Sequence, residues 1–359
     1  MLTLPTARVV LILALTCLLP AGAAPFPTTA PANPPARSPL DQAVEEAGAA
    51  TEPAPAARAD DARGTAHSFA SSWALFRNSY LTGWFMAVAL SLVGVLVVAR
   101  DQIFIGAALS QASALGVAVA LLLGTWAGHG AADHDAPAAG APLTSIMAVA
   151  FAVGAALLTA RGGHGGVGGE SHEAVTGWIF LVSASLSVLL ISRSPHGLEE
   201  IQRLASSSLI GATAADVWVF AAMAVVSGAV ALLFNRRILL LATDPAMAAA
   251  VGMRTGWWST GLAAWLGVVV GLSIRVSGML YTFGLLVLPA LLAKQLCREV
   301  RPMFLAAPVA ALAATAAGFV LADRYDFPPG QMSVALLALL LPAARLTRAA
   351  AARLSARRW

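Results

Sequence analysis

Three neighbouring polar residues, Ser110, Gln111 and Ser113, interrupt apolar sequence in the stretch GAALSQASALG, residues 106–116. The run IFI precedes this stretch and VAVALLLG follows it. Hydroxyl and amide groups in such a setting can line a polar passage, or they can hydrogen-bond between helices that pack closely on glycine and alanine. Both interpretations stay open at the level of the sequence.

Histidine and carboxylate side chains, which bind zinc and related divalent metals through nitrogen and oxygen, gather in three loops. The first loop holds His129, Asp133, His134 and Asp135, the second, glycine-rich loop holds His164, Glu170, His172 and Glu173, and the third holds His196, Glu199 and Glu200. These groups either concentrate a divalent cation beside the chain or are simply loop side chains in contact with water.

The composition predicts that the chain lies in a membrane. Hydrophobic residues make up 58% of the 359 residues, charged residues make up 11%, and the mean hydropathy is +0.77. Soluble domains contain fewer apolar and more charged residues. The isoelectric point of 9.7 does not indicate a nucleic-acid partner, because the basic residues are scattered and form no single face. The two cysteines, Cys17 and Cys297, provide no disulfide framework.

The two ends of the chain differ from its middle. Residues 1–23 contain Arg8, an apolar run and small residues up to Ala23, which predicts a cleavable signal peptide, with an uncleaved membrane helix as the alternative. Residues 24–80 begin with an alanine- and proline-rich stretch and are predicted to be a disordered extracytoplasmic tether. Residues 346–359 are predicted to be a basic cytoplasmic tail, and residues 81–345 the transmembrane domain.

Nine apolar stretches follow residue 80, and most of them are long enough to cross a bilayer. They lie near residues 81–99, 103–126, 143–160, 175–192, 214–234, 258–274, 276–293, 303–321 and 331–345. We expect helices, because unpaired backbone groups cost several kcal/mol in hydrocarbon and the sequence lacks β-barrel alternation. The predicted fold is an all-α integral membrane protein with about nine transmembrane helices. Between Arg275 and Gly278, a broken helix and a full loop are both consistent with the sequence.

The basic residues predict the orientation in the membrane. If the first stretch starts outside, one side receives thirteen basic residues and the other receives five, which is the bias expected for cytoplasmic loops. The thirteen are Arg100, Arg161, Arg236, Arg237, Arg254, Lys294, Arg298, Arg301, Arg345, Arg348, Arg353, Arg357 and Arg358, and the five are Arg77, Arg193, Arg203, Arg275 and Arg324. The prediction is therefore a multi-pass protein of the cytoplasmic (inner) membrane with its N-terminus outside and its C-terminus in the cytoplasm.

The histidines and acidic residues lie in tails, loops or at the edges of the apolar stretches, with Asp216 closest to the membrane interior. Proton- or ion-coupled carriers usually keep charged residues at mid-membrane, so we expect the energy for any transport to come from another subunit. The loop RRILLLATDPAMAAAVGMRTGWW, residues 236–258, contains a short helix signal, with Asp244 as N-cap, Pro245 at the first helical position and Gly252 as the stop. A small helix with an alanine face suits a groove on a partner.

Several segments together resemble the permease subunits of ABC importers for zinc, manganese and iron. The coupling-loop pattern of that family is matched by Asp244, Ala248 and Gly252, and a later pattern is matched by Gly278, Leu280, Leu285, Leu286, Pro289 and Ala290. The resemblance, over roughly residues 80–345, implies a divalent metal ion as cargo, no bound cofactor, and Gly278 and Pro289 as a gate or kink. It also implies a cytoplasmic ATPase that docks on the loop, an extracytoplasmic solute-binding protein and a second permease chain, besides membrane lipid. The chain has no phosphate-binding G-x-x-x-x-G-K-[ST] loop, so ATP is expected to be hydrolysed by the partner.

The polar stretch 106–116 departs from that family's pattern. Ala107 stands at the family's Asp position, Gln111 at its His position and Leu115 at its Pro position. Imidazole suits zinc and its neighbours, whereas neutral oxygens bind divalent ions weakly, so the passage either conducts without firm coordination or takes another substrate.

Three alternative functions remain at this stage. One is a permease for a metal chelate such as a siderophore. The second, an intramembrane enzyme, lacks a set of catalytic residues inside the spans. The third, a stand-alone channel, would not need a coupling loop.

Overall fold

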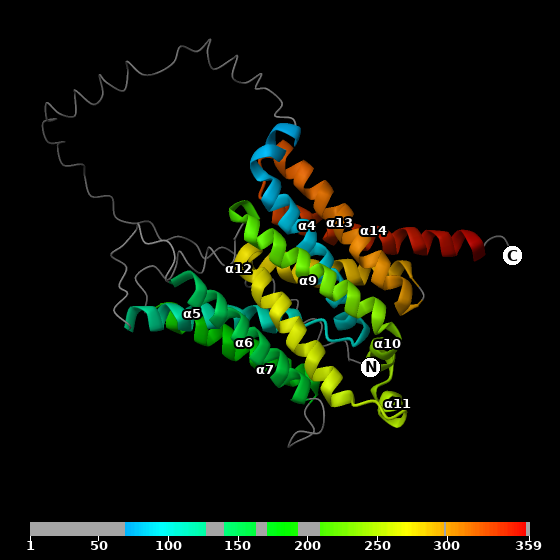
Figure 1. Ribbon diagram of the computed structural model, residues 1–359. Coiled ribbons are helices and arrows are strands. Elements are labelled where there is room, and N and C mark those ends of the chain that lie inside the picture. Colours follow the sequence, from blue (N-terminus) through cyan, green and yellow to red (C-terminus); the bar gives the residue numbers. More distant parts are fainter. Residues whose placement is uncertain (1–68, 127–139, 163–170, 193–208, 298, 357–359) are drawn as a thin grey trace, which may run out of the picture. The chain divides into compact units, whose positions relative to one another are not determined.

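The computed structural model describes residues 69–126, 140–162, 171–192, 209–297 and 299–356, and every regular element in these ranges is a helix (Figure 1). The elements are α4 (Phe69–Ala99), α5 (Ile105–Trp126), α6 (Gly140–Gly162), α7 (His172–Ile191), the 3₁₀ turn η1 (Leu209–Gly211), α9 (Ala214–Leu233), α10 (Asn235–Thr243), α11 (Pro245–Ala250), α12 (Thr255–Leu296), α13 (Val300–Tyr325) and α14 (Pro329–Ala356). The predicted signal peptide lies outside the described residues, as does the predicted tether up to residue 68.

Eight helices of the described ranges are long and apolar enough to cross a membrane, namely α4, α5, α6, α7, α9, α12, α13 and α14. Helix α12 contains two of the nine predicted stretches. At 1.5 Å per residue its 42 residues would extend about 63 Å, roughly twice the thickness of the hydrocarbon layer. The backbone breaks at Gly278, so each part of α12 has the length of one crossing. The sequence was consistent with either a broken helix or a full loop at this point, and the structure has the broken helix.

The first and last membrane helices are longer than predicted. Helix α4 begins at Phe69, so the end of the predicted tether, residues 69–80, is helical. Aromatic packing explains this extension, because Trp73 stacks on Tyr80 with ring centroids 5.8 Å apart and Tyr80 lies 5.2 Å from Phe319 of α13. Helix α14 likewise continues to Ala356, through most of the predicted tail, because this segment is rich in alanine, leucine and arginine, which favour helix.

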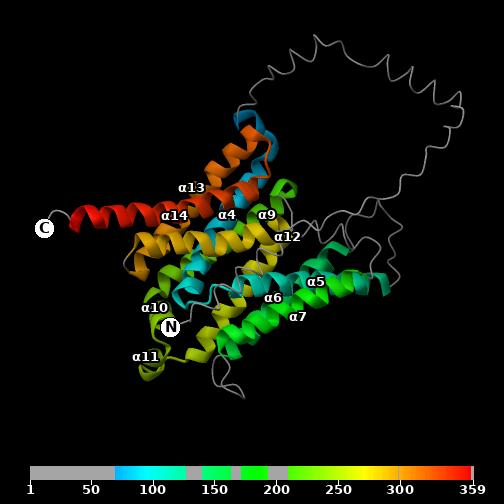
Figure 2. The same cartoon turned by 180° about the vertical axis from the view of Figure 1, so that it is seen from behind.

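Helix α12 is the central element of the membrane domain. It contacts α4, α5, α6, α13 and α14, while α4 also contacts α9 and α13. Most of the apolar span of α4, α5 and α12 is buried, whereas less than half of the span is buried in the other five helices. Figure 2 shows α5, α6 and α7 side by side, and it shows the two parts of α12 running in different directions, the second part next to α14. The first part packs closely on α6 at Gly267.

Glycines allow the backbones of neighbouring helices to touch. A Cβ atom at Gly94 of α4 would overlap the carbonyl oxygen of Leu286 in the second part of α12. A Cβ atom at Gly267, in the first part of α12, would come within 2.6 Å of the Cα atom of Val153 in α6. Helices in lipid associate through such close contacts, because hydrophobic burial gives little driving force there. Each part of α12 therefore depends on at least one glycine contact.

We predict that Gly94→Ala lowers the midpoint of thermal unfolding of the purified chain in detergent by several degrees. The added methyl group has no room beside the Leu286 carbonyl, and overpacking costs about 1–3 kcal/mol. Gly261→Ala is the matched control, because no heavy atom lies within 4 Å of a Cβ built at that position. Equal midpoints for the two variants would contradict the close packing of α4 on α12.

Candidate functional site

The predicted polar residues lie on α5, and one of them reaches another helix. The side-chain amide of Gln111 donates to the Sδ atom of Met279 across 3.7 Å, and both side chains are partly buried. Met279 directly follows the break in α12. This partner could not be recognised in the sequence, because a methionine in an apolar run is usually an ordinary packing residue. The structure therefore joins the polar stretch of α5 to the break in α12.

The two serines of the stretch have different surroundings. The hydroxyl of Ser110 is buried and donates to the carbonyl oxygen of Gly106, one turn earlier in its own helix, at 2.7 Å. The hydroxyl of Ser113 is also buried, and it has no hydrogen-bond partner within the described residues. A buried hydroxyl without a partner is costly. Of the three predicted residues, Gln111 is thus the one whose polar group makes a contact across helices.

The break in α12 is built from one glycine and two hydroxyl side chains. Gly278 has φ 78° and ψ 176°, a backbone conformation that is accessible essentially only to glycine. The hydroxyl of Thr282 donates to the Gly278 carbonyl oxygen at 2.8 Å, and the Ser277 hydroxyl donates to the Ser273 carbonyl oxygen at 2.9 Å. The two hydroxyl oxygens lie 3.2 Å apart. Pro289, predicted together with Gly278 as a gate or kink, is buried within α12, and Gly278 is the residue of this helix with non-helical angles.

An ion pair ties the start of α9 to the residues just before the break. The guanidinium of Arg275 donates to one carboxylate oxygen of Asp216 at 2.7 Å. The other oxygen of Asp216 accepts from the backbone N–H and the hydroxyl of Thr213, at 2.9 and 2.7 Å, and so completes a capping box at the start of α9. Asp216 was expected at the edge of a span, but its pairing with Arg275 could not be predicted, because 59 positions in the sequence separate the two residues.

The loop predicted to couple to an ATPase has the expected local structure. The side chain of Asp244 accepts from the backbone N–H of Met247 at 2.9 Å, Pro245 opens helix α11, and Gly252 has φ 82°. The capped helix with its glycine stop is therefore confirmed as structure.

The face of α11 that could meet a partner differs from the expected alanine face. The side chain of Ala248 is completely buried against its own chain. Met247 and Val251 are instead 53% and 67% exposed. These two apolar side chains, together with the exposed alanines of α11, form the surface available to a partner, and Ala248 fixes α11 to the rest of the chain.

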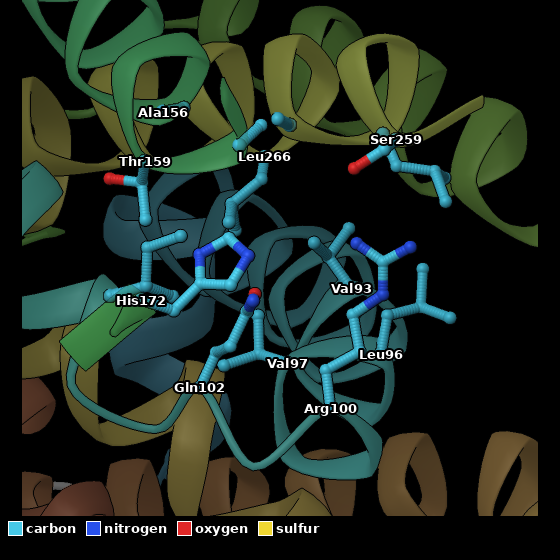
Figure 3. A pocket seen from close by; sticks show the side chains of 14 residues that line it. Val93, Leu96, Val97, Arg100, Gln102, Ala156, Thr159, His172, Ser259 and Leu266 are labelled. Atoms are coloured by element: carbon cyan, nitrogen blue, oxygen red, sulfur yellow. The ribbon is translucent and has the colours of Figure 1, made fainter. Parts of the chain in front are cut away.

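A small cavity of about 40 Å³ lies among α4, the α4–α5 turn, α6, α7 and the start of α12. Figure 3 shows the imidazole of His172 beside the side chain of Gln102, with the guanidinium of Arg100 across from them. Burial lowers the pKa of Arg100, but an arginine keeps its charge at neutral pH. This positive charge disfavours a divalent cation in the cavity, so His172 does not lie in surroundings that suit a metal ion.

Most of the predicted metal-binding loop residues lie in parts of the chain outside the described ranges. His129, Asp133, His134, Asp135, His164 and Glu170 lie outside the described residues, as do His196, Glu199 and Glu200. Glu173 is exposed in the first turn of α7. Within the described ranges, no three His, Cys, Asp or Glu side chains come together in a way that could hold a metal ion.

The sequence matches the family model of the ABC 3 transport family over residues 72–347. The chain belongs to this family. The match covers all the helices described above except the first residues of α4 and the end of α14. The resemblance to metal-importer permeases that the motifs indicated is thereby confirmed.

Curated relatives and solved structures are similar to this chain over most of its length. A probable metal transport system membrane protein of Thermotoga maritima is 24% identical, and the alignment covers 73% of this chain and 86% of the relative. The manganese import system permease protein ScaB of Streptococcus gordonii is 21% identical over 74% of this chain and 88% of its own. The fold is similar to that of PsaBC from Streptococcus pneumoniae, solved with a Fab, with a TM-score of 0.60, 17% identity, and coverage of 75% and 90% of the two chains.

We predict that Asp216 and Arg275 contribute non-additively to the stability of this ABC 3 family member. Asp216→Asn and Arg275→Gln should each lower the free energy of unfolding in detergent, Arg275→Gln by at most about 1 kcal/mol because its side chain is 44% exposed. Asp216→Asn should cost more, since it also weakens the cap of α9. The double variant should cost less than the sum of the two single variants, and strict additivity would show that the pair contributes nothing.

Proposed function

We propose that this chain is the membrane permease of an ABC importer that carries a divalent metal ion, namely zinc, manganese or iron, across the cytoplasmic membrane. The observation that carries the proposal is the family match across residues 72–347, supported by relatives that are described as metal and manganese transport proteins. The metal ion is the cargo, and the chain binds no resident cofactor.

The passage would run beside the break in α12, where α5 supplies Gln111 and α12 supplies Met279. An amide oxygen and a thioether are neutral, and the thioether is a soft ligand, so neither holds a divalent ion as firmly as the aspartate and histidine typical of the family. Weak ligands suit a passage that must release what it admits. Gln111 would therefore guide the ion without trapping it.

ATP would be hydrolysed by a separate cytoplasmic subunit that docks on α11. Its contact surface would include Met247 and Val251, which are exposed apolar side chains on a short and well-capped loop helix. An extracytoplasmic solute-binding protein would deliver the ion, and a second permease chain, identical or different, would complete the transporter.

The N-terminus would lie outside and the C-terminus in the cytoplasm. Two ion pairs support this topology, because each joins residues that the charge bias assigns to the same side. Arg275 pairs with Asp216 on the predicted outer side, and Lys294 pairs with Asp101 at 3.0 Å on the predicted cytoplasmic side. With a break at Gly278, α12 can cross from the cytoplasm and return to it.

A metal chelate is the second candidate for the cargo. One solved structure with a similar fold is described as a metal-chelate type ABC transporter in an inward-facing conformation, with a TM-score of 0.57 and 16% identity over 76% of this chain. The neutral side chains of Gln111 and Met279 also favour this candidate, because a chelated ion needs no strong ligand from the protein.

Uptake of metal into vesicles that contain the chain with its ATPase subunit tests the proposal. We expect ATP-dependent uptake of zinc, manganese or iron, and we expect Gln111→Ala to reduce it several-fold. Ser110→Ala should leave uptake unchanged, since this hydroxyl is bound to its own helix at Gly106. Uptake of a chelate but of no free ion would favour a metal chelate as the cargo. Uptake that does not depend on ATP would indicate a channel.

We also predict that Met247→Glu abolishes ATP-dependent uptake while the chain remains folded. A carboxylate on the exposed surface of α11 would have to be desolvated in an apolar contact with the ATPase subunit. Met247→Leu, which keeps the size and the apolar character, should retain most of the uptake. Co-purification of the ATPase subunit with each variant measures docking directly, and normal docking and uptake with glutamate would contradict the assignment of this surface.

A further inference from the structure

A basic hollow of about 440 Å³ opens where α9, α10 and α13 meet. It is lined by the residues Leu232, Leu233, Phe234, Asn235, Arg236, Arg237 and Arg301. Arg236 and Arg237 lie in the first turn of α10, Arg301 lies in the first turn of α13, and α10 contacts α13 in the fold. Three guanidinium groups from two helices distant in the sequence thus border one space.

Among the described residues, no ion pair balances the charges of this hollow. None of its lining residues is acidic. The ion pairs between described residues join Arg275 to Asp216 and Lys294 to Asp101, so none involves the three arginines, whose side chains are exposed. Helix α10 also begins without a side-chain cap. The hollow therefore favours a ligand with negative charge and several oxygen acceptors, for which guanidinium groups are well suited.

The position of the hollow specifies the kind of anion. The apolar span of α9 ends at Leu233, so the hollow lies where a membrane helix leaves the hydrocarbon. Leu232 and Leu233 are 79% and 77% exposed, and together with Phe234 they form an apolar wall next to the arginines. A free phosphate would contact the arginines alone. An anionic phospholipid would contact both the arginines, with its phosphate, and the apolar wall, with its acyl chains along α9.

We propose that this hollow binds the headgroup of an anionic phospholipid, such as phosphatidylglycerol or cardiolipin. The bound phosphate bridges α10 to α13, and α10 leads directly into Asp244 and the loop helix α11. The lipid thereby holds the segment from which α11 projects. This inference rests on the membrane location of α9 and is independent of the identity of the cargo.

The experiment measures binding of phosphatidylglycerol to the full-length chain in a neutral detergent by native mass spectrometry. The triple variant Arg236→Gln, Arg237→Gln, Arg301→Gln should weaken the tightest lipid adduct by about 100-fold, or about fivefold per arginine. A matched triple variant, Arg161→Gln, Arg254→Gln, Arg345→Gln, removes the same charge at exposed positions outside the hollow and should leave this adduct unchanged. Equal weakening in both triple variants would reduce the effect to overall charge and overturn the site.

Further arms separate a lipid from the other sources of negative charge. Leu232→Ser with Leu233→Ser should weaken phosphatidylglycerol binding, and inorganic phosphate in large excess should not displace the lipid. Full displacement by phosphate, with no effect of the leucine changes, would show a site for free phosphate.

Lipid binding that survives in the arginine variant while the ATPase subunit no longer co-purifies would assign the surface to a protein contact. Replacement of the three arginines by lysine keeps the charge and should retain most of the binding, which shows that these positions tolerate substitution and that the charge is what the lipid requires.

Discussion

Hydrogen bonding of the backbone inside hydrocarbon is the constraint on which the membrane domain depends, because lipid offers no partners for N–H and C=O groups. Regular helices satisfy this constraint, because their backbone groups bond to one another, and α12 is the element that departs from regular helical geometry. At Gly278 its backbone leaves the helical conformation. The hydroxyl of Ser277 donates to a carbonyl oxygen one turn before the break, and the hydroxyl of Thr282 donates to the carbonyl oxygen of Gly278 itself. Ser277 and Gly278 are also buried, so the irregular backbone at the break does not face lipid.

The same constraint explains why small residues decide the packing around α12. Since hydrophobic burial does little to hold helices together in lipid, contact depends on how closely their surfaces fit. Gly94 allows α4 to reach the second part of α12, and Gly267 allows α6 to reach the first part. Both parts of the broken helix are thus held by close backbone contacts, and the irregular segment between them stays fixed in position. That arrangement gives Gln111 a defined neighbour in Met279.

The local features of the sequence predicted the local structure well. The capped helix α11 follows from Asp244, Pro245 and Gly252, whose preferences act over a few residues and need no tertiary context. Contacts between distant residues could not be predicted, because nothing in a single sequence pairs Asp216 with Arg275 or Gln111 with Met279. Burial was missed for the same reason. An alanine face of α11 was expected to meet a partner, but Ala248 is buried, because the direction in which each side chain of α11 points is set by how α11 lies against its neighbours.

Under the proposed function, the order of residues along α12 links its two ends mechanically. Its first part begins a few residues after α11 and runs to Gly278, a rigid helical segment of about 35 Å. The ion pair of Arg275, the hydroxyl contact of Ser277, the break and the contact of Met279 all lie within five consecutive residues at its far end. A displacement of α11 by an ATPase would move this segment as a unit. Because these contacts are so close in sequence, such a movement would have to change the ion pair to α9 and the contact to Gln111 together. Coupling a displacement of α11 in the cytoplasm to the passage requires this geometry.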